Sequence, residues 1–349
     1  SRRDDSRHPS PMTQEVAIVS ALFNAFLWGS WAVFLKKLDS YPLDAFFLGI
    51  YIFSFVFVWM LAWIVLGQEL FEELARVWRA RPAIIIVALA AGGTFVIGVR
   101  ITMTVFTAVG LSVTAPVQTG MSLILGTSLA ALVGGRPASL APLDLAIACL
   151  LLFAAAMATV WARIVRDRLL FEAAATRLRD AAGQTSRRLI AKNMALVGFA
   201  SAIITAYPLG LSYSLRAPGR EYGLTPLSYV SVLVTGSLIG ALLTSGAVLT
   251  LRRQWSTFFR AGWAMHRFSL IAAGAHYGGN IINAFATGAL TAAVSWPIST
   301  TSQLWTYVWG LATGEFKGAP RKSFLLIATG ALLYLAGILY LRWALLRSA

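Results

Sequence analysis

The chain has 349 residues, of which 58% are hydrophobic and 12% are charged, and its mean hydropathy is +0.72. This composition excludes an ordinary soluble globular domain and indicates a membrane protein. The net charge of +15 does not indicate nucleic-acid binding, because the basic residues gather between the apolar runs, where a membrane protein carries its orientation signal.

The N-terminal segment 1–14 is predicted to be a disordered tail, since SRRDDSRHPSP is charged and has no periodic pattern. We expect no cleavable signal, because the first apolar run is as long as a full membrane span. Ten apolar runs of about 20 residues follow, each long enough for a helix to cross the hydrocarbon core, and their continuous apolarity excludes a β-barrel. The runs cover about 15–35, 44–66, 83–106, 110–133, 143–162, 193–214, 226–250, 268–288, 290–313 and 323–344.

The basic segment 163–192 divides the runs five and five, and it is predicted to be an amphipathic linker helix on the membrane surface. If the N-terminus lies outside, the inner segments hold most of the Lys and Arg, including Lys36 and Lys37. Both termini are therefore predicted to lie outside. The runs on either side of the linker form two candidate repeats, 15–162 and 193–345.

The two halves are similar at an offset of 181 positions, where Pro116 meets Pro297 and Thr119 meets Thr300. The boundaries of the apolar runs match at the same offset. A repeat with an odd number of spans must enter the membrane inverted, and inverted repeats place a substrate site between them near the midplane. The sequence thus predicts an all-α polytopic membrane protein with ten transmembrane helices arranged as two inverted five-helix repeats.

Polar side chains inside the apolar runs mark the predicted site. His276, Asn280, Asn283 and Thr287 fall within about 40° of one another on a helix. Because polar groups face lipid only at high cost, this stripe should face either a packed polar seam or a wet cavity. Four other runs carry comparable stripes: Asn24, Trp28 and Trp31; Arg100, Thr104 and Thr107; Gln118 and Ser122; Ser299, Gln303 and Thr306.

Each of these residue types also has a purely structural role. Ser, Thr and Asn form interhelical hydrogen bonds worth about 0.6–2 kcal/mol, and Trp packs in cores as readily as it stacks on rings. An arginine in mid-span costs roughly 2.5–3.5 kcal/mol, so Arg100 should pair, meet water or snorkel to the interface. The predicted substrate-binding set is Asn24, Trp28, Trp31, Arg100, Gln118, His276, Asn280, Asn283, Ser299 and Gln303.

Glycines and prolines are assigned to the backbone. GSLIG (236–240) and GAHYG (274–278) fit the small-xxx-small pattern that lets two helices approach closely. Pro208 and the repeat-related pair Pro116 and Pro297 are expected to kink their helices. Kinks at corresponding places in two repeats point to a binding site, because they free backbone polar groups.

Several chemistries have no support in the sequence. Carboxylates fall only at the ends of the apolar runs, which disfavours a cation exporter built around an intramembrane glutamate. The single cysteine, Cys149, excludes an intramolecular disulfide or a cysteine metal cluster. The chain lacks a phosphate-binding glycine loop, an HExxH motif and a nucleophile elbow. We therefore expect no enzymatic activity, no cofactor and no metal, and His276 is the natural group for proton coupling because histidine titrates near neutral pH.

The segments FLWGSWAVFLKK (26–37), FTAVGLSVTAPVQTGMSLILGTSL (106–129) and GEFKG (314–318), with the five-plus-five organisation, resemble the drug/metabolite transporter superfamily. The lysine pair after the first run and the large basic inner segments look most like the rhamnose–proton symporter, glucose/ribose porter and ureide permease groups. The resemblance implies a secondary transporter in the cytoplasmic membrane. Gly134 and Gly135 stand where the second repeat has Gly314 and Glu315, and this departure leaves the energy source open.

The sequence therefore predicts a multi-pass inner-membrane transporter that moves a monosaccharide or a ureide-like compound by alternating access, with proton symport as one option. An exporter of amino acids or other metabolites is the alternative within transport. A membrane enzyme using His266 and His276 and a lipid scramblase are the alternatives from other classes. The expected partners are a small polar substrate, membrane lipids and protons. A homodimer is left open, and no nucleic acid is expected.

Overall fold

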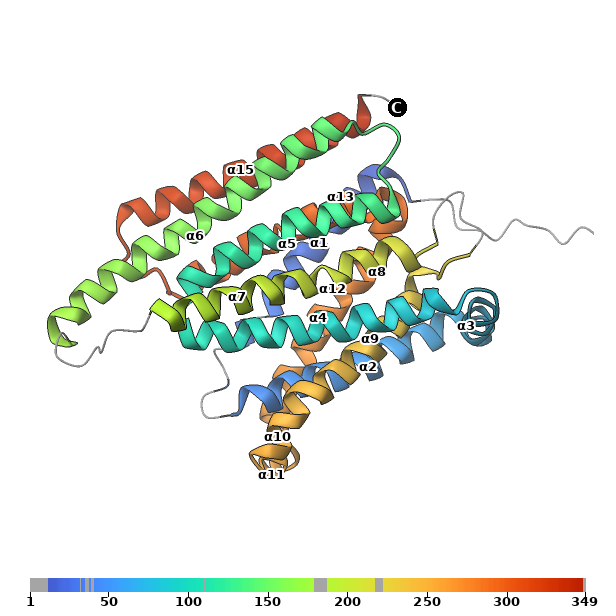
Figure 1. Cartoon of the computed structure of the whole chain (residues 1–349), viewed down its shortest axis with the longest axis horizontal. Coiled ribbons are helices and arrows are strands. Elements are labelled where there is room, and N and C mark those ends of the chain that lie inside the picture. The colour runs from blue at the N-terminus through green and yellow to red at the C-terminus, as the bar shows by residue number, and fades with distance from the viewer. Residues whose placement is uncertain are drawn as a thin grey trace, which may run out of the picture.

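In the computed structural model the described chain is folded into long helices (Figure 1). The predicted tail 1–14 and the lysine pair Lys36 and Lys37 lie largely outside the described residues. The structure describes residues 12–31, 33, 34, 38, 41–109, 111–178, 187–216 and 222–347, with side chains outside 106–117, 168–178, 187–191 and 264.

Where the structure describes it, each predicted apolar run coincides with one helix or with consecutive helices separated by a short break. The elements are α1 (Gln14–Ser30), α2 (Leu43–Leu66), α3 (Gln68–Ala80), α4 (Pro82–Val109), α5 (Leu111–Gly134), α6 (Pro142–Leu178), α7 (Arg187–Ile204), α8 (Ala206–Ser214), α9 (Pro226–Ala241), the π-helical turn η2 (Leu242–Gly246), α10 (Ala247–Leu251), α11 (Trp255–Arg260), α12 (Trp263–Leu290), α13 (Ala292–Ser299), α14 (Ser302–Ala312) and α15 (Arg321–Leu346).

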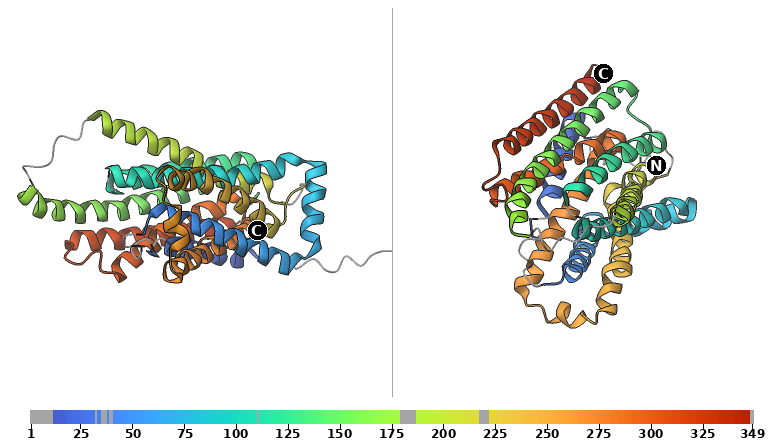
Figure 2. Two further views of the ribbon diagram at one scale, coloured as in Figure 1. Left: turned by 90° about the horizontal axis from the view of Figure 1, so that it is seen from below. Right: turned by 60° about the vertical axis from the view of Figure 1, so that its left-hand side comes forward.

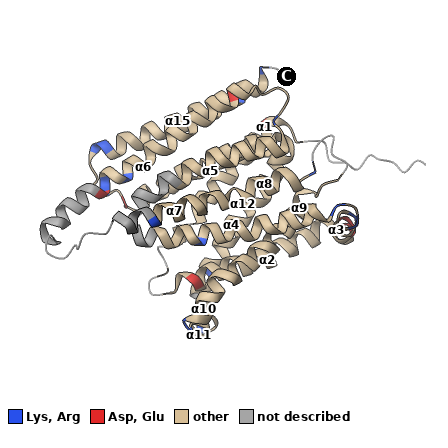
Figure 3. Ribbon diagram, viewed as in Figure 1, with Lys and Arg blue, Asp and Glu red and all other residues tan. Residues whose placement is uncertain are grey.

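Among the described residues, six stretches of helix are long and apolar enough to cross a membrane, which indicates an integral membrane protein. Lys, Arg, Asp and Glu gather towards the ends of the long helices and in α3 (Figure 3). This distribution leaves apolar middle sections of the length that a bilayer requires. The six stretches are Leu43–Leu66, Pro82–Val105, Pro142–Asp167, Lys192–Ser214, Pro226–Leu251 and Arg321–Leu346.

The helices of the two halves of the chain are interleaved. Helix α4 packs on α9 and α7, α2 packs on α12 and α9, and α1 packs on α12, α13 and α14. Helix α5 packs on α7, α8 and α13. The pair α6 and α15 lies side by side along one edge of the bundle (Figures 1 and 2). The core is therefore built from helices of both halves.

Glycines allow a close contact between α9 and α4. A Cβ at Gly236 would lie 1.9 Å from the Leu89 carbonyl oxygen, and one at Gly240 would lie 2.6 Å from that of Gly93. The packing role predicted for GSLIG is thus confirmed for the contact between α9 and α4. The same role predicted for GAHYG is wrong, because a Cβ at Gly274 would have no described atom outside its own helix within 4 Å.

Two helices are interrupted near prolines. The helix carrying Pro208 is broken at Thr205, between α7 and α8, and the helix carrying Pro297 is broken at Thr300 and Thr301, between α13 and α14. Proline lacks the N–H for the helical bond and crowds the preceding turn, which accounts for the break at Thr205 before Pro208. The break at Thr300 and Thr301 follows Pro297 and so lies outside the turn that this proline crowds. Helix α5 runs through Pro116 without interruption, so the breaks are confined to the second half of the described chain.

Residues 163–178 continue α6 instead of starting a separate linker helix. The predicted repeat boundary at 162 therefore falls inside one helix, and the rest of the predicted linker lies in 179–186, outside the described residues, and at the start of α7. Because α6 is continuous through this stretch, Arg163 and Arg166 lie on a helix of the bundle.

Helix α3, which the hydropathy pattern does not predict, crosses one end of the bundle between α2 and α4 (Figure 2). It is fastened there by Glu73, a buried carboxylate that accepts hydrogen bonds from the Thr225 backbone N–H (2.8 Å), the Thr225 hydroxyl (2.8 Å) and the Ser228 hydroxyl (2.5 Å). The carboxylate thereby caps the first turn of α9, where unpaired N–H groups favour negative charge.

We expect Glu73→Ala to lower the free energy of unfolding by about 3 kcal/mol, because the mutation removes a charged acceptor and leaves buried donors of Thr225 and Ser228 unpaired. The check is the unfolding midpoint in detergent micelles. Glu72→Ala, at an exposed position on the same helix, is the matched control and should change the midpoint little. Equal midpoints for the two variants would contradict the capping role.

Candidate functional site

A cavity of 460 Å³ lies between the two halves of the chain. Its walls come from α1, α2, α4, α5 and α6 of the first half and from α7, α12, α13 and α14 of the second. Its volume falls within the range of about 300–1,000 Å³ that is usual for small-molecule sites. The cavity is therefore the candidate functional site.

The cavity brings together six of the ten residues predicted from the sequence. These six are Trp28, Trp31, Gln118, His276, Ser299 and Gln303. The other four predicted residues do not line it, and they are Asn24, Arg100, Asn280 and Asn283.

His276 stands in an aromatic cage. Its ring centroid lies 5.6 Å from that of Trp31, 6.0 Å from Tyr51 and 6.3 Å from Phe95, whose ring is nearly parallel. The side chain is only 7% exposed, and neither ring nitrogen has a hydrogen-bond partner among the described residues. A buried imidazole with both nitrogens unsatisfied at a cavity wall is ready to bind a ligand group.

Tyr51 and Phe95 were not predicted as site residues. Aromatic side chains within an apolar run look like ordinary core packing in the sequence, so no signal distinguished them. Only the juxtaposition of α2, α4 and α12 identifies them as part of the cage.

Trp28 and Trp296 form the aromatic wall beside the cage. The Trp28 Nε1–H donates to the His276 carbonyl oxygen (3.2 Å), and the Trp28 ring meets the rings of Tyr207 and Trp296 edge-on. The Trp296 Nε1–H donates to the Ser122 carbonyl oxygen on α5 (3.1 Å). Both indole donors are therefore used, and the rings are held in fixed orientations.

A packed polar seam adjoins this wall. The Asn24 amide N–H donates to the Ser299 hydroxyl (2.8 Å), which lies 3.0 Å from Asn283 Oδ1 and 2.8 Å from the Ser295 carbonyl oxygen. The Asn283 amide N–H donates to the Tyr207 hydroxyl (3.2 Å). Asn24, Asn283 and Ser299 are all fully buried. The predicted polar stripes thus form both a seam and a cavity wall, side by side.

The α12 stripe faces the interior along its length, as predicted. Asn280 is 1% exposed and donates to the His276 carbonyl oxygen of its own helix (2.9 Å), and Thr287 contacts the Ser295 hydroxyl (2.6 Å). Only His276 of this stripe reaches the cavity, because the cavity ends where the seam begins.

Arg100 is paired, as its expected cost in mid-span requires. Its Nε lies 2.7 Å from Asp44 Oδ1 and its Nη2 lies 3.0 Å from Asp44 Oδ2, a two-point contact at the start of α2. The stripe predicted on α4 does not face the cavity, since Thr104 is exposed and binds Arg100, and the Thr107 side chain is outside the described part. The cavity face of α4 carries Phe95, Val99, Thr102 and Met103 instead.

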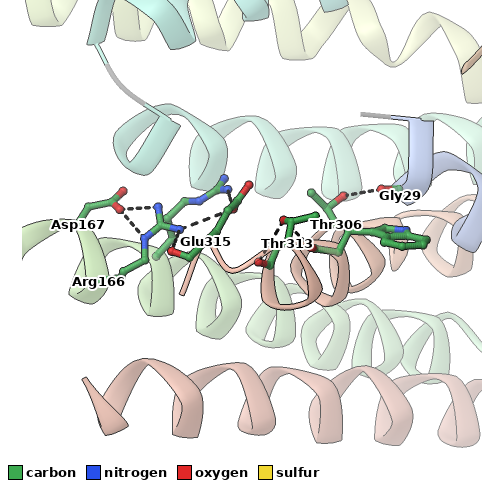
Figure 4. Close-up of polar contacts among 9 residues, drawn as sticks. Gly29, Arg166, Asp167, Thr306, Thr313 and Glu315 are labelled. Atoms are coloured by element: carbon green, nitrogen blue, oxygen red, sulfur yellow. Dashed lines mark hydrogen bonds and ion pairs between the residues drawn. The ribbon is translucent and has the colours of Figure 1, made fainter. Parts of the chain in front are cut away.

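One end of the cavity is charged. Arg163 on α6 and Glu315 after α14 both line it, with Arg163 Nη2 lying 3.2 Å from Glu315 Oε2. Arg166 Nη1 lies 3.7 Å from the same oxygen, and Arg166 also holds Asp167 (Figure 4). The sequence predicted that this basic stretch lies on the membrane surface and that Glu315 lies at the end of a span. It did not predict their pairing, because the partners are far apart in the sequence.

A glycine turn places Glu315. Gly314 has a φ of +77°, in the left-handed region, where a side chain is strained, and the Glu315 N–H donates back to the Gly310 carbonyl oxygen (2.9 Å). This turn ends α14 and folds the carboxylate towards α6. The GEF sequence is thus a helix terminus that delivers a charge to the cavity.

No family model matches the sequence, and no curated protein matches it. Within the described residues, no group of three or more His, Cys, Asp or Glu side chains is arranged to hold a metal ion. The fold and the cavity define an integral membrane protein with an internal site lined by aromatic rings, neutral polar groups and one charged end.

Proposed function

We propose that the chain is a secondary active transporter of a small polar metabolite. In this proposal ten helices cross the cytoplasmic membrane as two inverted five-helix repeats, as the resemblance to the drug/metabolite transporter superfamily implies. The observation that carries the proposal is a cavity shared by both halves of the chain and bounded by the seam of Asn24, Ser299 and Asn283.

The packing pairs support the inverted repeat. If α1, α2, α4, α5 and α6 correspond to α7–α8, α9, α12, α13–α14 and α15, then exchanging the halves maps the contacts onto one another. The contact of α4 with α9 corresponds to that of α12 with α2, and the contact of α4 with α7 corresponds to that of α12 with α1. The pairs α6 with α15 and α2 with α9 are their own counterparts. A twofold relation of this kind is the basis of alternating access in inverted-repeat transporters.

The unequal ends of the cavity support alternating access. On the side towards the start of α1, the cavity is bounded by the seam residues Asn24, Ser299 and Asn283, which are fully buried. Towards the end of α14, the cavity reaches Arg163 and Glu315, which are 16% and 26% exposed. This arrangement fits a state open on one side, and rocking of one half against the other would reverse it.

The cavity lining favours a polar ring over a lipophilic cation. Gln118, Gln303 and His276 offer neutral donors and acceptors, while Trp28 and Trp31 offer flat apolar faces. Monosaccharides and ureide-like compounds combine these properties. An exporter of amino acids or other metabolites remains the second candidate, since the charged end provides both a cation and an anion.

The alternatives from other classes find less support in these contacts. The rings of His266 and His276 are surrounded by aromatic side chains, including Phe53, Phe258 and Tyr51, and an enzyme would require a catalytic carboxylate there. A scramblase would require a polar groove facing lipid, whereas the polar stripe of α12 faces inward.

We expect wild-type protein in proteoliposomes to show saturable counterflow of a monosaccharide or a ureide, and we expect His276→Phe to reduce kcat/KM at least about tenfold. The substitution keeps the aromatic volume and removes both ring nitrogens. If His276 couples protons, acceleration by an imposed pH gradient should be lost as well. His266→Phe, outside the cavity, is the matched control. If the wild-type protein shows no counterflow of any monosaccharide or ureide tested, the proposal is overturned. Equal flux in the two variants would show that His276 is not part of the site.

A further inference from the structure

The charged end of the cavity contains two arginines with unequal pairing. Arg166 holds Asp167 through Nε (2.7 Å) and Nη2 (2.5 Å), so the fork of its guanidinium is occupied by a neighbouring carboxylate. Arg163 lines the cavity and contacts Glu315 through Nη2 alone, at 3.2 Å. Its Nε is buried and has no hydrogen-bond partner among the described residues.

Such a guanidinium is incompletely satisfied. Arginine binds carboxylates best by two parallel hydrogen bonds from its planar fork, and a buried donor left unpaired costs free energy. Arg163 is held in place by the α6 backbone and by the ring of Tyr307, whose centroid lies 5.7 Å from Cζ. It therefore places a fixed positive charge at the cavity wall, in a guanidinium group that has one donor unused.

We propose that Arg163 binds a carboxylate of the transported molecule, so that the substrate class is a small polar acid, such as a sugar acid or a ureide acid. This inference rests on the proposed transport function. Substrate recognition is shared between the two ends of the cavity. Arg163 binds the carboxylate of the substrate, while Gln118, His276 and the tryptophans contact its uncharged part.

Glu315 is then the built-in competitor of the substrate. Its Oε2 occupies one donor of Arg163, and the same oxygen lies 3.7 Å from Arg166 Nη1. Figure 4 shows Glu315, in the turn after α14, reaching towards the side chain of Arg166. An entering carboxylate can displace Glu315 from Arg163 while Glu315 stays beside Arg166. Removing the charge of Glu315 should therefore favour acid substrates, the opposite of removing Arg163.

The experiment is counterflow in proteoliposomes with pairs of probes that differ in a carboxylate: glucose and glucuronate, galactose and galacturonate, allantoin and allantoate. Wild type is expected to prefer the acid of at least one pair by about tenfold in kcat/KM. Arg163→Gln should lower kcat/KM for that acid roughly 30-fold or more and so abolish the preference for the acid over its neutral partner. Glu315→Gln should raise kcat/KM for the acid about fivefold.

Arg342→Gln is the control for the loss of one positive charge, because Arg342 forms an exposed pair with Glu15 and does not line the cavity. Transport of neutral probes without preference for any acid would overturn the carboxylate assignment and leave the transporter proposal standing. A preference for the acid that persists in Arg163→Gln would also overturn the carboxylate assignment. If Arg163→Gln does not fold, the preference of the wild-type protein within the probe pairs and the effect of Glu315→Gln decide whether the carboxylate assignment holds. Failure of all six probes would contradict the proposed function itself.

Discussion

Gly236→Ala is expected to separate α9 from α4 and to lower the free energy of unfolding by about 3 kcal/mol. The added Cβ would lie 1.9 Å from the Leu89 carbonyl oxygen and 2.7 Å from its carbon, so backbone atoms must move. No rotamer change can relieve this clash. A Cβ at Gly92, on the opposite helix, would lie 2.0 Å from the Leu233 carbonyl oxygen, so the contact is tight from both sides. The measurement is the unfolding midpoint and the monodispersity of the purified protein in detergent.

Gly274→Ala is the matched control. It is also a Gly→Ala change in a long helix, but the added Cβ meets no described atom beyond its own helix within 4 Å. Alanine has the higher helix propensity by about 1 kcal/mol, so this variant should be neutral or slightly more stable. Equal destabilisation of the two variants would show that helix propensity, not the contact of α4 with α9, decides the result.

Ser299→Ala is expected to loosen the seam and to make the cavity accessible from the side at which α1 begins. The hydroxyl accepts from Asn24 and contacts Asn283, and all three side chains are fully buried. Its removal leaves those amide groups unpaired at a cost of about 2 kcal/mol, which corresponds to a shift of roughly 30-fold between the closed and open seam. The cost falls on the closed state because water can satisfy the groups once the seam opens.

Accessibility can be measured with a single reporter thiol in the cavity, introduced as Gln118→Cys in a Cys149→Ser background. A membrane-impermeant maleimide added to either side of sealed vesicles reports which side reaches the cavity. Ser201→Ala is the matched control, since its buried hydroxyl bonds only the Val197 carbonyl oxygen of its own helix (2.7 Å). If the labelling rate from the seam side is unchanged by Ser299→Ala, the seam is not a gate.

The polar residues of the seam and those of the cavity wall have different tasks. Asn24, Asn283 and Ser299 hold helices together across the two halves, whereas His276, Gln118 and Gln303 face open space. A substitution in the first group should therefore change the balance between conformations. A substitution in the second should change substrate recognition with little effect on that balance.

The helical elements could be predicted because hydropathy and helical periodicity are local properties. The runs reappear as helices, and the α12 stripe faces inward, since a period of 3.6 residues places His276, Asn280 and Asn283 on one face in any packing arrangement. The hydropathy pattern did not predict the helices correctly where charged residues interrupt it. Helix α3 was missed because it is amphipathic, and α6 was ended too early because its basic C-terminal part resembles a surface segment.

By itself, the sequence determined an all-helical membrane protein and the inward direction of its polar stripes, because both follow from the preference of a single helix for lipid or interior. The tertiary structure alone decided which polar groups meet: Arg100 with Asp44, Glu73 with Thr225, and Arg163 with Glu315. Periodicity states the direction in which a side chain points, but not which helix lies opposite. The partners in the last two pairs are 152 positions apart, and only the packing of the two halves brings them within hydrogen-bond distance.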